Sequence, residues 1–535
     1  MLRKLFLAIT AFLTLLPAGA QEITRLTTEY MDRPMGIDVK QPVFGWQMQS
    51  DRYGAAQTAY RIVFATSEEN LENGTYTYDS GTVNSPTSVC IKYNGPELAP
   101  CTRYYWQVLV TDERGKVHES PASWFETGLM GGLWGNAMWI ASSKMQVSPY
   151  RFDYAIEYDV ETAKPGPAKF IFGAPQEDCY VFVMLDTRDS AKVMLGNALY
   201  NKETVQHTLN VSNIIPPADA TKKHHIRLEV RGGGNYDVKV SLDGRVISQG
   251  NQTSINCMRD SIGRQQARLF SIGYRQPQGF DAVFSNIKLL NYKWDNLVLN
   301  SDPKTYNAKG DDKAVLWMPS SDINAPIMRK NVNVTKVVKR ARLYATARGA
   351  YWFYINGQRV GDGYLNPGWT DFRHRIMYNT YDVTQMLRQG NNALGIELGH
   401  GWFCDDFGWA GAMWGDQYGY KPSALAMIKV EYTDGTNETF VTDNTWKVYN
   451  GGPLYVNNLY HGVIYDARRE VDGWKEPGFN DAAWEKVAIL PPPPASTEIQ
   501  GYVGLEIKNN ITLTAKKMTR IGNRFIYDMG QNFAG

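Results

Sequence analysis

The stretch from residue 351 to residue 409 constrains the fold of this chain most strongly. It opens with Tyr-Trp-Phe-Tyr-Ile before an Asn-Gly pair, passes a Pro-Gly pair, and ends in Gly-His-Gly-Trp-Phe-Cys-Asp-Asp-Phe-Gly-Trp. Short runs that alternate aromatic and polar residues and stop at such pairs predict β-strands joined by turns. The stretch therefore predicts a small β-sandwich with aromatic-rich loops at one end, and such loops suit sugar binding.

The length and composition of the chain favour several domains of one class. Its 535 residues are too many for a single hydrophobic core, and a prior of about 150 residues per domain predicts about three or four domains. Aromatic residues make up 13% of the chain, with 32 Tyr and 15 Trp, and 48 Gly and 25 Pro supply frequent turns. We expect an all-β chain of several β-sandwiches whose aromatic rings serve either the cores or exposed sugar contacts. A formal net charge of +2 argues against nucleic acid as a partner.

The first twenty residues have the pattern of a signal peptide. Arg3 and Lys4 supply the positive region, residues 5–16 the apolar region, and Ala-Gly-Ala the cleavage site. The mature chain is expected to begin at Gln21 and to be exported to the periplasm or the extracellular space. No later apolar run approaches the ~20 residues that span a bilayer, so no membrane insertion is expected.

Five cysteines are too few and too irregularly spaced for a metal knuckle or a dense disulfide framework, since no Cys-x-x-Cys pair occurs. Cys90 and Cys101 are placed to pair across a hairpin. Buried free thiols are the alternative, and the sequence leaves this disulfide state open. The five are Cys90, Cys101, Cys179, Cys257 and Cys404.

Two β-rich segments follow the signal peptide. In residues 21–128 the aromatic cluster 104–106 leads into an alternating strand, a pattern that resembles immunoglobulin or fibronectin type III modules. Residues 140–292 predict a second sandwich that resembles laminin-G or concanavalin-like jelly rolls. No cofactor is required, but four carboxylates in this second segment are candidate calcium ligands, with ordinary surface turns as the alternative. They are Asp186, Asp189, Asp237 and Asp243.

The remaining chain predicts a linker, a third sandwich and a further partial domain. Residues 293–313 are polar and rich in turn formers, which favours a linker. Residues 314–490 alternate clearly and predict the third sandwich. A Pro run at 491–494, which has no amide donors for a sheet, begins a linker, and residues up to 535 predict the start of another, truncated β-sandwich.

Five motifs follow one another along the third sandwich. They are Tyr-Ile-Asn-Gly at 354–357, Leu-Asn-Pro-Gly-Trp-Thr-Asp-Phe at 365–372, Tyr-Asp-Val-Thr at 381–384, Gly-His-Gly-Trp at 399–402 and Tyr-His-Gly-Val-Ile-Tyr-Asp-Ala-Arg-Arg-Glu at 460–470. In this order they resemble the amino-terminal half of the bacterial α-L-rhamnosidases, which are multidomain inverting glycoside hydrolases. The leading segment 21–128 and the final residues 527–535 resemble neighbouring domains of that family, whereas residues 140–292 look like an insertion.

The resemblance implies where the chemistry belongs. In that family an (α/α)6 barrel carries the general acid and base carboxylates, and we expect this barrel after residue 535, so no catalytic residue is carried over. The chain stops within a motif at Gly535, which favours a fragment or an incomplete gene. We expect the accessory, non-catalytic half of a secreted enzyme that removes terminal α-L-rhamnose from glycans and is inactive without its downstream catalytic domain. The alternatives are a free-standing carbohydrate-binding or adhesin-like protein and a structural scaffold.

The candidate carbohydrate-binding residues lie on two loops of the third sandwich. Inverting hydrolysis needs two carboxyl groups roughly 6.5–9.5 Å apart, and no carboxylate here has a partner whose spacing the sequence fixes. Asp371 is better suited to capping a turn, and Asp466 to fixing a loop by pairing with Arg468. The tryptophans suit a platform for a rhamnose-containing oligo- or polysaccharide or, equally, packing between domains. The candidates are Trp369, Asp371, Trp402, Asp405, Asp406, Trp409 and Trp414.

Overall fold

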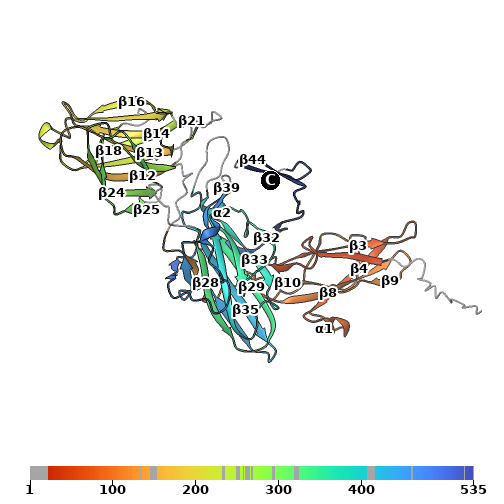
Figure 1. Ribbon diagram of the computed structural model, residues 1–535. Coiled ribbons are helices and arrows are strands. Elements are labelled where there is room, and N and C mark those ends of the chain that lie inside the picture. Colours follow the sequence, from red (N-terminus) through yellow and green to blue (C-terminus); the bar gives the residue numbers. More distant parts are fainter. Residues whose placement is uncertain are drawn as a thin grey trace, which may run out of the picture. The chain divides into compact units, whose positions relative to one another are not determined.

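The protein is built almost entirely from β-strands, as the sequence predicts (Figure 1). The α-helices of the described residues are the short α1 (Glu68–Glu72) and α2 (Gly401–Cys404), and none is long and apolar enough to cross a membrane. Residues 1–20, Cys257, Asp406, Trp409 and Trp414 lie outside the described part. The computed structural model describes residues 22–132, 134–144, 153–231, 235–248, 254–256, 258–259, 265–266, 269–291, 296–317, 325–405, 416–459, 462–522 and 524–533.

The first compact unit contains the leading sandwich together with short later segments at 377–380 and 499–505. Its central strand, β8, buries every second residue, so that Tyr104 and Trp106 enter the core. The ring of Trp106 meets Phe44 edge to face at 4.8 Å. In one sheet the strands lie in the order β1 (Glu22–Thr28), β3 (Val43–Gln49), β7 (Ile91–Lys92). In the other the order is β2 (Met35–Ile37), β10 (Ser123–Thr127), β8 (Arg103–Asp112), β4 (Gln57–Ala65), β5 (Tyr78–Asp79), with β6 (Val83–Asn84) beside β4 and β9 (Val117–Glu119) beside β8.

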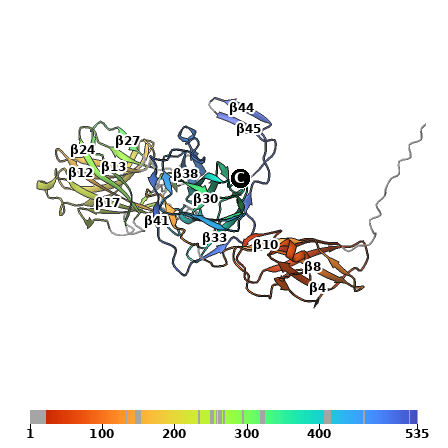
Figure 2. The same cartoon turned by 90° about the horizontal axis from the view of Figure 1, so that it is seen from below.

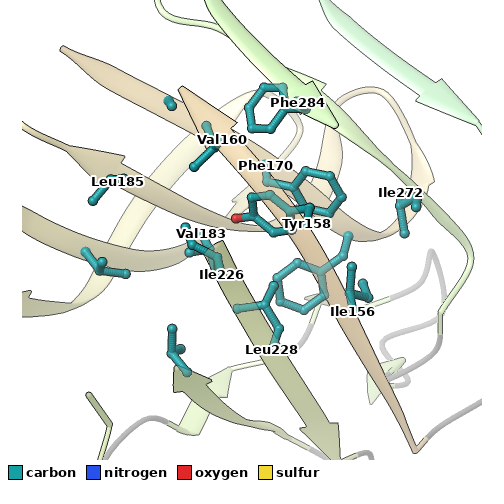
Figure 3. Close-up of a cluster of buried hydrophobic side chains, with 14 of the residues drawn as sticks. Ile156, Tyr158, Val160, Phe170, Val183, Leu185, Ile226, Leu228, Ile272 and Phe284 are labelled. Carbon is teal, nitrogen blue, oxygen red and sulfur yellow. The ribbon is translucent and has the colours of Figure 1, made fainter. Parts of the chain in front are cut away.

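The second sandwich packs two antiparallel sheets over an aromatic core. Tyr158 stacks on Phe170 with ring centroids 4.2 Å apart, and both lie against Phe284 (Figure 3). Figure 2 shows its strands β12, β13, β17 and β24 gathered in one body. In one sheet the strands lie in the order β19 (Arg245–Val246), β18 (Asn235–Leu242), β17 (His224–Arg231), β12 (Tyr154–Thr162), β24 (Ala282–Asn291), β25 (Leu297–Asp302). In the other the order is β16 (Lys202–Asn210), β15 (Lys192–Leu199), β14 (Cys179–Asp186), β13 (Pro167–Gln176), β23 (Ser271–Arg275), β27 (Ala314–Trp317).

The boundaries of this sandwich differ from those predicted. Residues 297–308, expected as a linker, form β25 and β26 (Tyr306–Ala308), which both pair with β24, and β27 pairs with β23. The linker prediction is wrong because these are short strands at a sheet edge, and the turn formers between them hide the strand pattern. At the other end, β11 (Trp139–Ala141) pairs with strands of the third sandwich. In sequence, the second sandwich is therefore inserted between β11 and the other strands of the third sandwich, with which β11 pairs.

The third sandwich holds the stretch that opened the sequence analysis. Its core includes Phe353 and Trp446, whose rings meet edge to face at 6.4 Å. Strand β41 ends at Leu490, immediately before the Pro run. One sheet contains, in order, β41 (Ala488–Leu490), β11, β35 (Ser423–Tyr432) and β29 (Val338–Arg348), with β36 (Asn437–Val441) beside β35, and the other orders β31 (Gln358–Arg359), β30 (Ala350–Ile355), β34 (Gly390–Gly399), β28 (Ile327–Val334), β37 (Lys447–Tyr449) and β40 (Glu485–Lys486).

After the third sandwich the chain forms a two-stranded antiparallel hairpin, β44 (Lys517–Ile521) and β45 (Arg524–Asp528). All ten of its strand residues are exposed, including Met518 and Tyr527, which face each other across the hairpin. A two-stranded hairpin alone is at best marginally stable in water, so this element depends on further packing.

Candidate carbohydrate-contact site

Trp369 projects from a loop that is anchored at its base to the core of the third sandwich. The loop follows β32 (Gly363–Tyr364) and turns between Leu365 and Gly368, where the Gly368 amide donates to the Leu365 carbonyl at 2.9 Å. Both residues have positive φ, and Gly368 adopts it without a Cβ clash. Buried Asn366 donates from Nδ2 to the Tyr381 hydroxyl and to Glu506 Oε1, each at 2.9 Å. These bonds hold the loop base, so Trp369 is presented from a fixed support.

Two tryptophans on neighbouring loops stack face to face. Trp369 and Trp402 have ring centroids 5.0 Å apart and planes within 10° of each other. Trp369 is 54% exposed and Trp402, in α2, is half-buried. The indole Nε1 of Trp369 donates to the Tyr418 hydroxyl at 3.2 Å. We call Trp369, Trp402 and Tyr418 the tryptophan platform, and beneath it Phe372 meets Phe403 edge to face.

Asp371 lies beside the platform but is paired with Arg373. Nε and Nη2 of Arg373 donate to the two carboxylate oxygens at 2.8 and 2.7 Å. This hydrogen bonding lowers the pKa of Asp371 to about 2. Its Oδ1 also accepts from the Arg373 amide, so Asp371 closes a turn, as one of the two sequence interpretations predicts. Asp466 has the same arrangement with Arg468, whose hydrogen bonds lower the pKa of Asp466 to about 2.

The carboxylate of Asp405 is engaged within the fold. Asp405 is buried, and its carboxylate accepts hydrogen bonds from the Asn458 side chain and from the Leu459 amide. The carboxylate therefore fixes the chain at residues 458–459, and the expectation that Asp405 binds sugar hydroxyls is not supported by its geometry. Asp406, Trp409 and Trp414 lie outside the described residues.

The four candidate calcium ligands are spread over the two sheets of the second sandwich. Asp186 ends β14 and pairs with Arg188 Nη2 at 2.7 Å, whereas Asp237 belongs to β18 on the other sheet. Asp243 Oδ2 lies 2.8 Å from His224 Nδ1. Within the described ranges, no group of three or more His, Cys, Asp or Glu side chains is placed to hold a metal ion. The calcium proposal thus has no cluster to support it there.

Sequence reasoning missed the residues that support Trp369. Tyr418 lies in an aromatic-rich stretch, which is a signal that it belongs with the tryptophans. Glu506 gives no such signal, because it reaches Asn366 across 140 positions of sequence. Cys90 is a free, exposed thiol, so the structure does not pair it with Cys101, and of the described cysteines Cys179 and Cys404 are buried.

The two parts of the chain that carry the motifs match known protein families. Residues 336–508, which contain the tryptophan platform, match the family described as the Alpha-L-rhamnosidase N-terminal domain. Residues 23–131 match the Rha78A-like, N-terminal immunoglobulin domain. The chain belongs to the α-L-rhamnosidase family. The resemblance inferred from the motifs is confirmed.

Known α-L-rhamnosidases are similar along most of the chain. An α-L-rhamnosidase from Streptomyces avermitilis is 30% identical over 545 residues, which cover 97% of this chain and 49% of that protein. One from Formosa agariphila is 31% identical over 242 residues, covering 45% of this chain and 26% of that protein. The crystal structure of Streptomyces avermitilis α-L-rhamnosidase complexed with L-rhamnose superposes with a TM-score of 0.63 at 28% identity, covering 96% and 49% of the two chains. The chain thus spans about half the length of the first of these relatives.

Proposed function

We propose that the described residues form the accessory, non-catalytic part of an exported α-L-rhamnosidase that hydrolyses terminal α-L-rhamnose from glycans. In this proposal they contact a rhamnose-containing oligo- or polysaccharide, and the acid and base of hydrolysis belong to a downstream catalytic domain. The observation that carries the proposal is the tryptophan platform, an exposed indole fixed by stacking within the Alpha-L-rhamnosidase N-terminal domain.

The platform has the properties that a sugar contact requires. A pyranose ring presents C–H groups to a flat aromatic face, and binding sites combine such faces with a few polar groups. Stacking on Trp402 and the hydrogen bond to Tyr418 orient Trp369 before any ligand arrives. A preoriented ring loses less side-chain freedom on binding than a mobile one, which favours affinity.

The neighbouring carboxylates support a non-catalytic role. A general acid in glycoside hydrolysis must hold its proton near the working pH, which requires a raised pKa. Asp371 and Asp466 have pKa values of about 2 because Arg373 and Arg468 stabilise the ionised form. They are therefore ionised at neutral pH, and their oxygens are already occupied.

Calorimetric titration with a rhamnose-containing oligosaccharide tests the sugar contact. We expect Trp369→Ala to weaken binding about tenfold, because one aromatic contact of about 1.4 kcal/mol is lost. The matched control is Tyr53→Ala, which removes a fully exposed ring from the leading sandwich and should leave the affinity unchanged. Equal affinities for the wild-type chain and Trp369→Ala would remove the support that the platform gives to the proposal.

A free-standing carbohydrate-binding protein is the second candidate, because the same exposed platform favours it. The two candidates differ in the coding sequence beyond codon 535. A reading frame that continues into helix-rich sequence with paired carboxylates supports the accessory role, whereas a stop codon supports the free-standing protein.

A further inference from the structure

A second group of aromatic and charged side chains lies on the third sandwich, on the outer face of the sheet formed by β30, β31 and β34. In the strand register Trp352 is directly opposite Glu397, and Tyr354 is opposite Arg359. Side chains alternate between faces along a strand, and Phe353 belongs to the core. Trp352 and Tyr354 therefore point away from the core, with an acid and a base as their immediate neighbours.

Arg359 is held between two rings that remain partly exposed. Its guanidinium carbon lies 4.4 Å from the ring centroid of Trp352 and 4.7 Å from that of Tyr364. The two rings meet edge to face at 6.2 Å, and each residue is 38% exposed. Arg359 Nη2 also donates to the Gly363 carbonyl. These contacts fix the direction of the guanidinium and leave aromatic surface open beside it.

Glu397 is oriented by the tyrosine beside it. Its Oε2 accepts a hydrogen bond from the Tyr354 hydroxyl at 2.5 Å. Burial and the nearby Glu397 charge raise the pKa of Tyr354, so the phenol remains a donor at neutral pH. Glu397 forms no ion pair with any other residue of the described ranges. Its second oxygen is therefore an acceptor without a cation of its own.

We propose that Trp352, Tyr364, Arg359 and Glu397 form a second carbohydrate-binding surface that takes one pyranose unit of a neutral glycan. Glu397 accepts from one ring hydroxyl, the Arg359 guanidinium donates to another, and the open surface of Trp352 contacts the C–H face of the ring. This surface shares no residue with the tryptophan platform and does not rest on the function proposed for it.

The balance of charge and the position of these groups favour a small neutral ligand. Lys475 Nζ also lies 3.8 Å from the Tyr354 ring centroid, so the charges beside Glu397 are of both signs and form no single-sign field for a phosphate, a carboxylate or an ammonium group. A stable protein interface buries about 800 Å² per partner and is depleted of charge at its centre, whereas here the Arg359 guanidinium lies between two partly exposed rings. All four side chains come from β-strands or the ends of β-strands, which position groups more accurately than long loops do.

Saturation-transfer difference NMR on the full chain tests this surface. The probes are the methyl glycosides of α-L-rhamnose, β-D-glucose and β-D-galactose, with sodium D-glucuronate as the anionic comparison. We expect at least one neutral methyl glycoside to bind the Trp369→Ala variant, in which the platform has lost its exposed ring. Adding Trp352→Ala should weaken that binding at least tenfold, and D-glucuronate should bind more weakly than the neutral probes.

A conservative variant distinguishes a loss of binding from a folding defect. Glu397→Gln keeps an acceptor for Tyr354 but loses the charge, and it should weaken binding at least fivefold without changing the unfolding midpoint. Loss of all neutral-glycoside binding in Trp369→Ala alone would overturn the proposal. Unchanged affinity in both Trp352→Ala and Glu397→Gln would overturn it too, and would favour a protein partner for these rings.

Discussion

At the scale of single residues, one local motif explains why conspicuous carboxylates are structural. In three turns an Asp precedes an Arg by two positions, at Asp186, Asp371 and Asp466. In each turn the Arg amide donates to Oδ1, and the guanidinium Nε and Nη2 donate to the two carboxylate oxygens. In these three turns the Asp-x-Arg sequence saturates the carboxylate, whereas Asp112 and Asp243, which also precede an Arg by two positions, pair with His118 and His224 instead. The sequence predicted the pairing with Arg for Asp466 but treated Asp186 as a calcium candidate.

The pKa of Asp371 tests this motif. The Arg373 hydrogen bonds lower it to about 2 from an unperturbed value of about 3.9. A lowered native pKa stabilises the fold fully above the unfolded value, and this contribution is lost as pH falls through about 2. In Arg373→Gln we expect the carboxyl titration, followed by carbon-13 NMR, to move up towards 3.9. A wild-type midpoint already near 4 would show that the pair does not form in solution.

The cysteines provide a second test at this scale. Cys90 is exposed with its sulfur 3.3 Å from the Tyr30 hydroxyl, whereas Cys179 and Cys404 are buried. We expect an aromatic disulfide reagent to modify Cys90 rapidly and the two buried thiols only after denaturation. Cys90→Ser should remove the fast phase. If the native wild-type chain has no fast-reacting thiol, Cys90 is not a free exposed thiol in solution.

At the scale of elements, Arg329 fastens a long loop to the outer face of a sheet. It is fully buried on β28 and donates to the carbonyls of Trp474 and Glu476, at 2.9 and 3.1 Å, and to the Asp481 carboxylate. Trp474 packs beneath it against Tyr354 and Ile327. Arg329 thus adds hydrogen bonds and an ion pair to the hydrophobic contact that links β28 to residues 474–481.

Removing this guanidinium should destabilise the third sandwich. Breaking a buried ion pair costs roughly 3–5 kcal/mol, and because Asp481 keeps Lys447 as a partner we expect Arg329→Met to cost about 2–4 kcal/mol in urea unfolding. Lys447→Met is the matched control, since it removes the more exposed partner of the same carboxylate, and it should cost about 1 kcal/mol or less. Equal effects of the two variants would contradict the role given to Arg329.

The elements that sequence patterns predicted best are those with one buried face. Strand β8 alternates between buried and half-buried residues at every position, because one side meets the core and the other is only partly covered. Strands β25 and β26 were missed because they are short edge strands within a segment rich in turn formers. The pairing of Trp352 with Glu397 was missed for another reason: it depends on strand register between residues 45 positions apart, which no local pattern encodes.

At the scale of the whole molecule, the three sandwiches have separate hydrophobic cores. Phe170 belongs to the core of the second sandwich and Phe353 to that of the third, and the leading sandwich has its own cluster around Trp106. Because no residue is shared between these clusters, each sandwich can lose its packing independently. The insertion of the second sandwich after β11 therefore leaves the other two cores intact.

Calorimetric unfolding should show this independence. Phe170→Ala removes a fully buried ring and should lower the free energy of unfolding of the second sandwich by about 3–5 kcal/mol. Phe353→Ala is the matched variant in the third sandwich. We expect each variant to shift one heat-absorption peak and to leave the other in place. A single transition that both variants shift equally would mean that the sandwiches unfold as one unit.

The most direct test of the central claim is the hydrolysis rate of the chain on an aryl α-L-rhamnoside. In the proposed arrangement the glycan contacts lie within the described residues and the acid and base of hydrolysis lie elsewhere. We therefore expect the purified chain, without any other domain, to release the aryl group no faster than buffer between pH 4 and pH 8. Release at an enzyme-like rate, about 1 per second or faster, would contradict it by placing the active site within this chain.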